Sequence, residues 1–235
     1  MFKKKNIINF ESAIDIYPDN LVPAKKLIPK WYKDIPKWQD GILVSPPNPK
    51  LRKTLKNCIP FLDALISGYI VTLAHDVVIT KDSLGNPFLT ANHYGDPAIL
   101  NRDIEMSYVQ KPNGFYKNEF AWNFPLAIEI PKGYSVLVTH PFNRFDLPFI
   151  TLTGIIDSGW IIPAGGQAPF ILQNNFDGIL TKGTPIMQII PFKNENWILE
   201  KKNNLVESAQ VYLKKSNSVI SGWYKNNIWN KKSYD

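Results

Sequence analysis

Residues 125–192 constrain the fold of this 235-residue chain more than any other part. Short runs of β-branched and aromatic residues alternate there with proline and glycine, a pattern typical of short strands joined by tight turns. Turns are expected at residues 131–133 and 181–183, where the apolar runs stop. We therefore expect a mainly β core, with no helix of three or more turns in this stretch.

The chain divides by composition into three parts. Residues 1–57 form a basic arm rich in tryptophan and proline. Its residues 1–24 are expected to form one or two short strands, and its residues 25–49 are expected to be extended and irregular. Residues 58–192 are expected to form the β domain. Residues 193–235 form a tail in which apolar residues recur at helical spacing.

The tail is expected to be an amphipathic helix. Its apolar side chains recur at three- and four-residue steps from Leu205 onward. Serine, asparagine and glycine lower helix propensity between residues 216 and 222, so a break is expected there. We expect Leu213, Ile220 and Trp223 to be buried against the body or a partner.

Other parts of the β domain carry simpler signals. Residues 68–80 read as one long strand, residues 83–87 as a hairpin loop, and residues 106–110 as another strand. The aromatic residues from 115 to 124 are expected to pack on the sheet. Cys58, the single cysteine, excludes an internal disulfide or a thiolate zinc cage and is expected to be a small buried side chain.

The net charge of +7 is unevenly distributed. Residues 1–57 carry twelve basic and five acidic residues, and residues 193–235 carry eight and four, whereas residues 58–192 carry seven and eleven. The ends are therefore basic (+7 and +4) and the middle is acidic (−4). Basic ends suit phosphates or an acidic partner, although exposed lysines are often only solvated. No apolar run approaches the roughly 20 residues that span a bilayer, and the first residues do not resemble a secretory signal.

Three motifs, in order, resemble the dUTPase and dCTP deaminase superfamily. They are an apolar strand, Pro-x-Gly-Tyr and a second apolar strand at 126–138, Gly-Ile-Ile-Asp-x-Gly-Trp at 154–160, and Gly-x-x-Ile-x-Gln at 183–188. The resemblance covers about half the chain. It implies a mainly β, β-clip core and a homotrimer whose subunits exchange C-terminal segments.

The chain also resembles a family of phage-encoded proteins. Trp-Tyr-Lys at 31–33, Cys-Ile-Pro at 58–60 followed by Asp63, and Thr-His-Pro-Phe-Asn-Arg at 139–144 carry this second resemblance. It implies a cytoplasmic protein of the host cell, or a virion component, and brings no activity with it.

The superfamily resemblance implies a nucleotide site. Asp157 would be the catalytic carboxylate that orients water or the sugar hydroxyl. The ligand-binding candidates are Tyr69, His140, Asn143, Arg144, Asp146, Trp160 and Gln188. Arg144 would contact a phosphate in a rebuilt anion or sugar site. Alternatively, the polar residues at 140–146 only hydrogen-bond the backbone in a tight loop, and Asp157 only accepts backbone N–H groups in a turn.

The chain departs from the superfamily pattern at several positions. Ile70 and Pro185 replace an expected aspartate and an expected arginine, and Arg144 lies two residues after the usual arginine position. The deaminase's glutamate would fall near Ile171, and the glycine-rich motif that closes the site is missing. These losses favour a non-enzymatic binding or assembly protein over the alternative, a dUTPase-related pyrophosphatase. No cofactor or metal is expected, except Mg if the hydrolase alternative holds.

The basic arm supports a second alternative, binding of nucleic acid. Its candidate residues are Lys30, Trp31, Tyr32, Lys33 and Trp38, because aromatic rings stack on bases while lysines neutralise phosphates. The competing interpretation is that the aromatic residues pin the arm onto the body or onto a neighbouring subunit.

Overall fold

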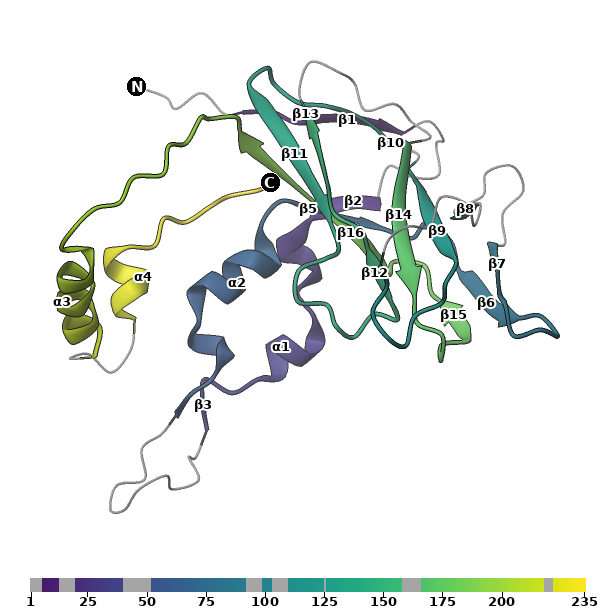
Figure 1. The fold of residues 1–235 in the computed structure, drawn as a ribbon, viewed down its shortest axis with the longest axis horizontal. Coiled ribbons are helices and arrows are strands. Elements are labelled where there is room, and N and C mark those ends of the chain that lie inside the picture. The colour runs from purple at the N-terminus through teal and green to yellow at the C-terminus, as the bar shows by residue number, and fades with distance from the viewer. Residues whose placement is uncertain are drawn as a thin grey trace.

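The structure is a computed structural model, which describes residues 6–12, 20–39, 52–91, 99–102, 110–124, 126–157, 166–217 and 222–235. Antiparallel strands gather on one side of the molecule, and the helices lie on the other (Figure 1). The prediction of a mainly β chain is confirmed.

Two antiparallel sheets form the body. The first has five strands in the order β13 (Gly154–Asp157), β11 (Tyr134–Thr139), β16 (Pro185–Lys193), β5 (Tyr69–Thr72) and β2 (Leu21–Pro23). The second has four strands in the order β12 (Phe149–Thr151), β14 (Gly166–Leu172), β9 (Glu119–Phe124) and β8 (Ile99–Arg102).

Smaller sheets and short helices surround this body. The sheets are β15 (Gly178–Leu180) with β6 (Val77–Lys81) and β7 (Pro87–Ala91), β1 (Asn9–Ser12) with β10 (Leu126–Glu129), and β3 (Trp38–Gln39) with β4 (Arg52–Lys53). The helices are η2 (Ala24–Leu27), α1 (Lys30–Asp34), η3 (Leu55–Asn57), α2 (Ile59–Ile66), α3 (Leu205–Asn217) and α4 (Trp223–Asn227).

An aromatic cluster lies at the centre of the core. Trp122 of β9 is fully buried and stacks on Phe170 of β14, with ring centroids 3.8 Å apart. Phe149 meets the Trp122 ring edge to face at 4.9 Å. The buried indole N–H donates a hydrogen bond to Thr151 Oγ1 at 3.0 Å, so the polar atom is satisfied as buried tryptophan requires. The aromatic stretch predicted to pack on the sheet thus supplies one of its strands.

The predicted strands and turns between residues 125 and 192 are confirmed where the structure describes them. Turns at 132–133 and 182–183 separate β10 from β11 and β15 from β16. The loop predicted at 83–87 is confirmed as the connection between β6 and β7. The strand predicted at 106–110 falls mostly outside the described residues.

The single long strand predicted over residues 68–80 is wrong. The segment breaks into β5 and β6, which belong to different sheets. Leu73 binds the turn before β16 instead of continuing β5: its N–H donates to Thr184 O at 2.9 Å, and its carbonyl accepts from Gly183 at 2.8 Å. The period of apolar residues does not show where a strand leaves its sheet.

The buried position predicted for Cys58 is also wrong. Cys58 is exposed, and it precedes α2, which forms from the apolar residues expected to begin the core. The helix turns only Asp63 and Leu65 into buried positions.

The short strands predicted for residues 1–24 are confirmed as β1 and β2, of which β2 belongs to the β body. β1 pairs with β10, and β2 extends the five-stranded sheet beside β5. Residues 24–39 form short helical turns and β3, so the prediction of an extended, irregular arm is wrong for this part.

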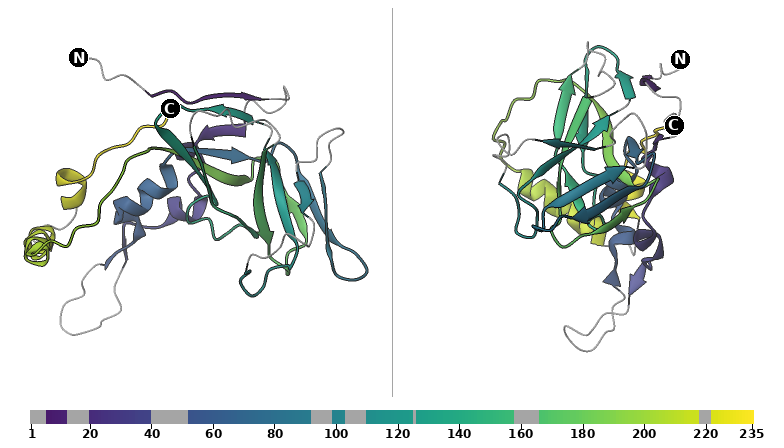
Figure 2. Two further views of the ribbon diagram at one scale, coloured as in Figure 1. Left: turned by 45° about the horizontal axis from the view of Figure 1, so that its top comes forward. Right: turned by 90° about the vertical axis from the view of Figure 1, so that its right-hand side faces the viewer.

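The tail forms two helices with the predicted break between them. We name residues 194–228 the C-terminal arm; it leaves the body at Asn194, whose N–H donates to Gly133 O at 2.8 Å. Figure 2 shows both helices standing away from the sheets. Leu213 is 61% exposed, so the prediction that it is buried against the body of its own chain is wrong. Trp223 is half-buried and contacts Tyr212. Ile220 lies outside the described residues.

Candidate functional site

The five-stranded sheet presents two different faces. Successive side chains of a strand point to opposite faces, and residues directly opposite in an antiparallel pair share a face. Met187, Val138 and Ile156 therefore face the second sheet, whereas Gln188, Thr139 and Asp157 face outward. The predicted catalytic residue thus lies on the outward face.

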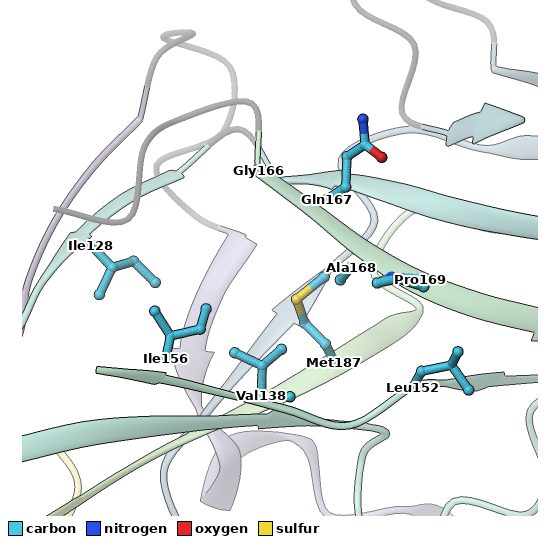
Figure 3. A pocket seen from close by; sticks show the side chains of 10 residues that line it. Ile128, Val138, Leu152, Ile156, Gly166, Gln167, Ala168, Pro169 and Met187 are labelled. Carbon is cyan, nitrogen blue, oxygen red and sulfur yellow. The ribbon is translucent and has the colours of Figure 1, made fainter. Parts of the chain in front are cut away.

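A cavity of about 240 Å³ opens on the inward face. Its described lining residues are Ile128, Val138, Leu152, Gly154, Ile156, Gly166, Gln167, Ala168, Pro169 and Met187. Figure 3 shows the aliphatic side chains of Ile128, Val138, Ile156 and Met187 converging, while the amide of Gln167 points away from them. None of these lining residues is charged, so the described wall suits an apolar group and offers no cation to a phosphate.

The polar residues predicted at 140–146 lie together in a tight turn. Asn143 adopts a left-handed conformation with φ of 59°, and the Arg144 N–H donates to Pro141 O at 3.2 Å. Asparagine tolerates this conformation better than most residues, which explains its presence here.

Arg144 forms a bidentate ion pair with Asp146. Its Nε and Nη2 atoms donate to the two carboxylate oxygens at 2.8 and 2.9 Å. Burial alone would raise the pKa of Asp146, but the hydrogen bonds and charge of Arg144, together with a hydrogen bond from Trp31, lower it. A phosphate at Arg144 would have to compete with this carboxylate.

His140 is held on both ring nitrogens. Nδ1 accepts from the Thr151 N–H at 3.3 Å, and Nε2 lies 3.1 Å from Arg144 O, to which it can donate. Both bonds together require the neutral ring with its proton on Nε2. Burial lowers the pKa of His140 below 6.5, with the nearby Arg144 charge acting in the same direction.

We expect His140 to make stability depend on pH. Its pKa is lower in the folded chain than in the unfolded chain, so the unfolded chain binds the proton first, and stability is lost as pH falls below about 6.5. Urea unfolding at about pH 7.5 and pH 5.5 should show a smaller loss on acidification for His140→Gln than for the wild type. Equal losses in the two proteins would contradict this role.

Gln188 ties the turn to α2. Its Oε1 accepts from the Phe142 N–H at 2.8 Å, and its Nε2 donates to Ala64 O at 3.0 Å and Ser67 O at 2.6 Å. The side chain is 1% exposed. With these bonds made, Gln188 positions backbone segments and has no amide proton left for a ligand.

Asp157 lies apart from this cluster. Ser135 Oγ donates to Asp157 Oδ1 at 2.6 Å and lies 2.7 Å from Asn194 Oδ1. Ser135 and Thr139 are four residues apart on β11, which at about 3.3 Å per residue places Asp157 roughly 13 Å from the Gln188 end. Within one chain the structure does not bring the two halves of the predicted site together.

Tyr69 meets the end of the chain. The Tyr234 ring contacts it edge to face at 6.1 Å. Burial raises the pKa of Tyr69, Tyr234 and Asp235 raise it further, and Lys25 opposes them. Lys25 also forms an ion pair with Asp235.

Asp63 binds the last residues of the chain as well. Trp229 Nε1 donates to its two carboxylate oxygens at 3.0 and 2.9 Å, and Lys232 Nζ lies 2.5 Å from Oδ2. We name Trp229, Lys232 and Tyr234 the C-terminal latch. Sequence reasoning placed no role on Asp63 or the latch, because a contact across 166 residues leaves no local pattern.

The aromatic residues of the N-terminal part pack onto α2. Tyr32 is 3% exposed and stacks on Phe61 at 5.7 Å, and Trp31 meets the same ring at 6.2 Å. Lys56 lies over the Tyr32 ring, 4.7 Å from its centre. In this arrangement Tyr32 offers no face to a base.

The other arm candidates lie near the surface. Lys30 and Lys33 are exposed on α1, where Lys30 pairs with Asp34 at 2.5 Å, and Trp38 is half-buried in β3. Trp160 lies outside the described residues.

Among the described residues, no group of three or more histidine, cysteine, aspartate or glutamate side chains is placed to hold a metal ion. The helices described here also include none that is both long and apolar enough to cross a membrane.

The solved structures similar to this chain include three dUTPases. One is the native dUTPase of EIAV, with a TM-score of 0.29 and 14% identity over 59% of this chain and 85% of that chain. Two mutant phage dUTPases, from phage phi11 of S. aureus and from Staphylococcus bacteriophage 80alpha, match at TM-scores of 0.30 and 0.29 with 14% identity. They cover 58% and 59% of this chain and 83% of each of those chains.

No protein-family model matches the chain, and no curated protein matches it. The similarity to these solved structures assigns no role to any residue of this chain.

Proposed function

We propose that this dUTPase-like protein has a degenerate nucleotide site and acts as a non-enzymatic binding or assembly protein. One observation carries the proposal. The polar side chains expected to hold a nucleotide bond one another and the backbone, while the described wall of the cavity on the opposite face of the sheet is apolar.

The energetics of phosphate binding support this proposal. Catalysis of pyrophosphate cleavage depends on cations placed where charge develops in the transition state. Arg144 is committed to Asp146, and Pro185 stands where the superfamily has an arginine. A phosphate at Arg144 would have to displace Asp146, so it would gain less from this arginine than from an unpaired one.

We expect no turnover of dUTP or dCTP above the buffer background, with Mg present. The loss of one preorganised donor typically costs about 10²–10³ in rate, and here two expected arginines are displaced or replaced. Conversion of each nucleotide is measured by chromatography, which detects both the loss of pyrophosphate and deamination, for the purified chain and for Asp157→Asn. If the purified chain turns over a nucleotide and Asp157→Asn abolishes that turnover, the proposal is wrong and the hydrolase alternative holds.

Binding without turnover is measured separately. A nucleotide panel that raises the melting temperature would identify a ligand, because binding to the folded state stabilises it. The gain in the free energy of unfolding depends on the ratio of ligand concentration to Kd. It is about 2.7 kcal/mol when the ligand concentration is a hundred times Kd.

The assembly that we propose is a homotrimer. The acidic middle of the chain, at −4, and the basic ends, at +7 and +4, can attract one another between copies. Light scattering should give about three times the chain mass of 26.8 kDa at tens of micromolar, a concentration at which a specific interface of roughly micromolar Kd is occupied. A measured mass of one chain would contradict the homotrimer.

A further inference from the structure

Exposed lysines gather in the unit formed by η2, α1, the β3–β4 pair and η3. Residues 20–39 carry five basic residues and one acidic residue, and residues 52–57 carry three basic residues and no acidic one. Four of these lysines are exposed and follow one another within residues 26–37: Lys26, Lys30, Lys33 and Lys37. We name these four residues the lysine surface.

The two segments of this unit are bonded to each other. β3 pairs with β4, and the Thr54 N–H donates to Lys37 O at 3.3 Å. Lys56 Nζ donates to Tyr32 O at 2.8 Å and to Lys33 O at 3.0 Å. Figure 1 shows α1 and β3 away from the sheets, on the same side of the molecule as α2. The backbone that carries the lysine surface is therefore held in place.

α1 turns its lysines away from its aromatic contacts. Trp31 and Tyr32 pack on Phe61 of α2. Lys30 and Lys33 are three residues apart, so they are neighbours on the opposite side of the helix. Neighbouring like charges repel each other, and a partner with several negative charges relieves this repulsion.

The lysine surface is open to an anion, unlike the arginine of the candidate site. Lys30 pairs with Asp34, but the two side chains are 87% and 57% exposed, and an exposed pair of this kind contributes little. The other three lysines make no ion pair with the described residues. By contrast, the Arg144 side chain is 14% exposed and is held by Asp146.

The aromatic rings of the unit favour a duplex over a single strand. Tyr32 stacks on Phe61 and has Lys56 over its ring, and Trp31 meets both aromatic rings edge to face. Single strands are usually bound by stacking of their bases on free aromatic rings. A duplex instead presents about one negative charge per 1.7 Å of its axis, and contacts to its phosphates need no base.

We propose that the lysine surface binds the phosphate backbone of a double-stranded nucleic acid without reading its sequence. This inference rests on the binding role in the proposed function and names the partner. It replaces the base stacking by Trp31 and Tyr32 that the sequence suggested with phosphate contacts by lysines.

Fluorescence anisotropy with a short labelled DNA duplex tests the proposal. Affinity falls with a logarithmic salt slope of about −0.9 per phosphate contact, so four contacts predict a loss of about 10²-fold between about 50 and about 200 mM salt. K30Q/K33Q/K37Q should reduce the steepness of this slope by about 3 and weaken binding about tenfold or more at about 50 mM salt. Changing the sequence of the duplex should have little effect.

K81Q/K132Q/K182Q is the matched control. It removes the same charge from exposed lysines of β6 and of the turns before β11 and β16. Its affinity and salt slope should stay close to those of the wild type. Substitutions at exposed lysines are expected to keep the fold, which the melting temperatures of both variants verify.

Three results would overturn the proposal: no binding of the duplex at about 50 mM salt, an equal loss in both variants, and tighter binding of a single strand than of the duplex. If the duplex is not bound and K30Q/K33Q/K37Q lowers the mass of the assembly, the lysine surface instead meets the acidic middle of a second copy. None of these results bears on the catalytic silence, which is measured separately by nucleotide conversion.

Discussion

Replacing Trp122 with alanine is expected to lower the free energy of unfolding by about 3–5 kcal/mol, the usual cost of truncating a large buried aromatic residue. Its ring is fully buried and stacks on Phe170 at 3.8 Å, with Phe149 against its edge at 4.9 Å. The truncation leaves a cavity at the centre of the second sheet. Total stabilities are only about 5–15 kcal/mol, so the variant is expected to lie close to unfolding.

Urea unfolding separates this packing loss from other effects. Thr151→Val keeps the ring but removes the acceptor of the indole N–H and the hydroxyl that donates to Ile186 O. It should cost about 1–3 kcal/mol for each buried group left unpaired. Trp197→Ala makes the same truncation at a residue that is 85% exposed and should change the stability by less than about 0.5 kcal/mol. Similar losses for Trp122→Ala and Trp197→Ala would mean that the aromatic cluster does not hold the core.

The second large effect is expected for Gly68→Ala, with a loss of about 4 kcal/mol or more. Gly68 has a φ of +70°, which costs other residues about 1–2 kcal/mol. A Cβ atom added there would lie 2.0 Å from the backbone oxygen of Ile189. Relief of that overlap would require β5 and β16 to separate, and the contact from the Ala24 N–H to Gly68 O at 3.0 Å would move with them.

Gly85→Ala is the matched control for this change. Gly85 also has a positive φ, of +80°, but an added Cβ would meet nothing within 4 Å. It should therefore show the conformational cost alone, about 1–2 kcal/mol. The difference between the two unfolding midpoints measures the steric term at Gly68, and equal midpoints would show that β5 and β16 can move apart without cost.

The β core could be predicted because its signals are local. Apolar runs bounded by the Gly133 and Gly183 turns fix short strands, and the spacing of apolar residues after Leu205 fixes α3. The break between β5 and β6 was missed because it depends on bonds from Leu73 to a turn more than a hundred residues away. No local pattern reports such a contact.

The candidate site could also be predicted only in part, because some of its contacts depend on distant segments. The cluster at 140–146 was predicted to be polar and close-knit, and the structure brings His140, Arg144 and Asp146 together. The sequence left open whether these groups would face a ligand or bond the backbone. The pairing of Arg144 with Asp146 was not predicted, because it depends on the conformation of the turn, in which Asn143 is left-handed. The outward position of Asp157 follows from strand register, which is set by pairing between distant segments.

The C-terminal latch has a consequence for the order of folding. Asp63 precedes Trp229 by 166 residues, so during synthesis its carboxylate is made long before the groups that bind it. A carboxylate without partners stays in water, because its burial alone is costly. We therefore expect α2 to associate with the sheets first, while Asp63 is still hydrated. Asp63 becomes buried only when Trp229 and Lys232 bind it. Because Asn194 is held at the β body by Gly133 O, the contact then closes only the segment from residue 194 to Trp229, and we expect it as a late step.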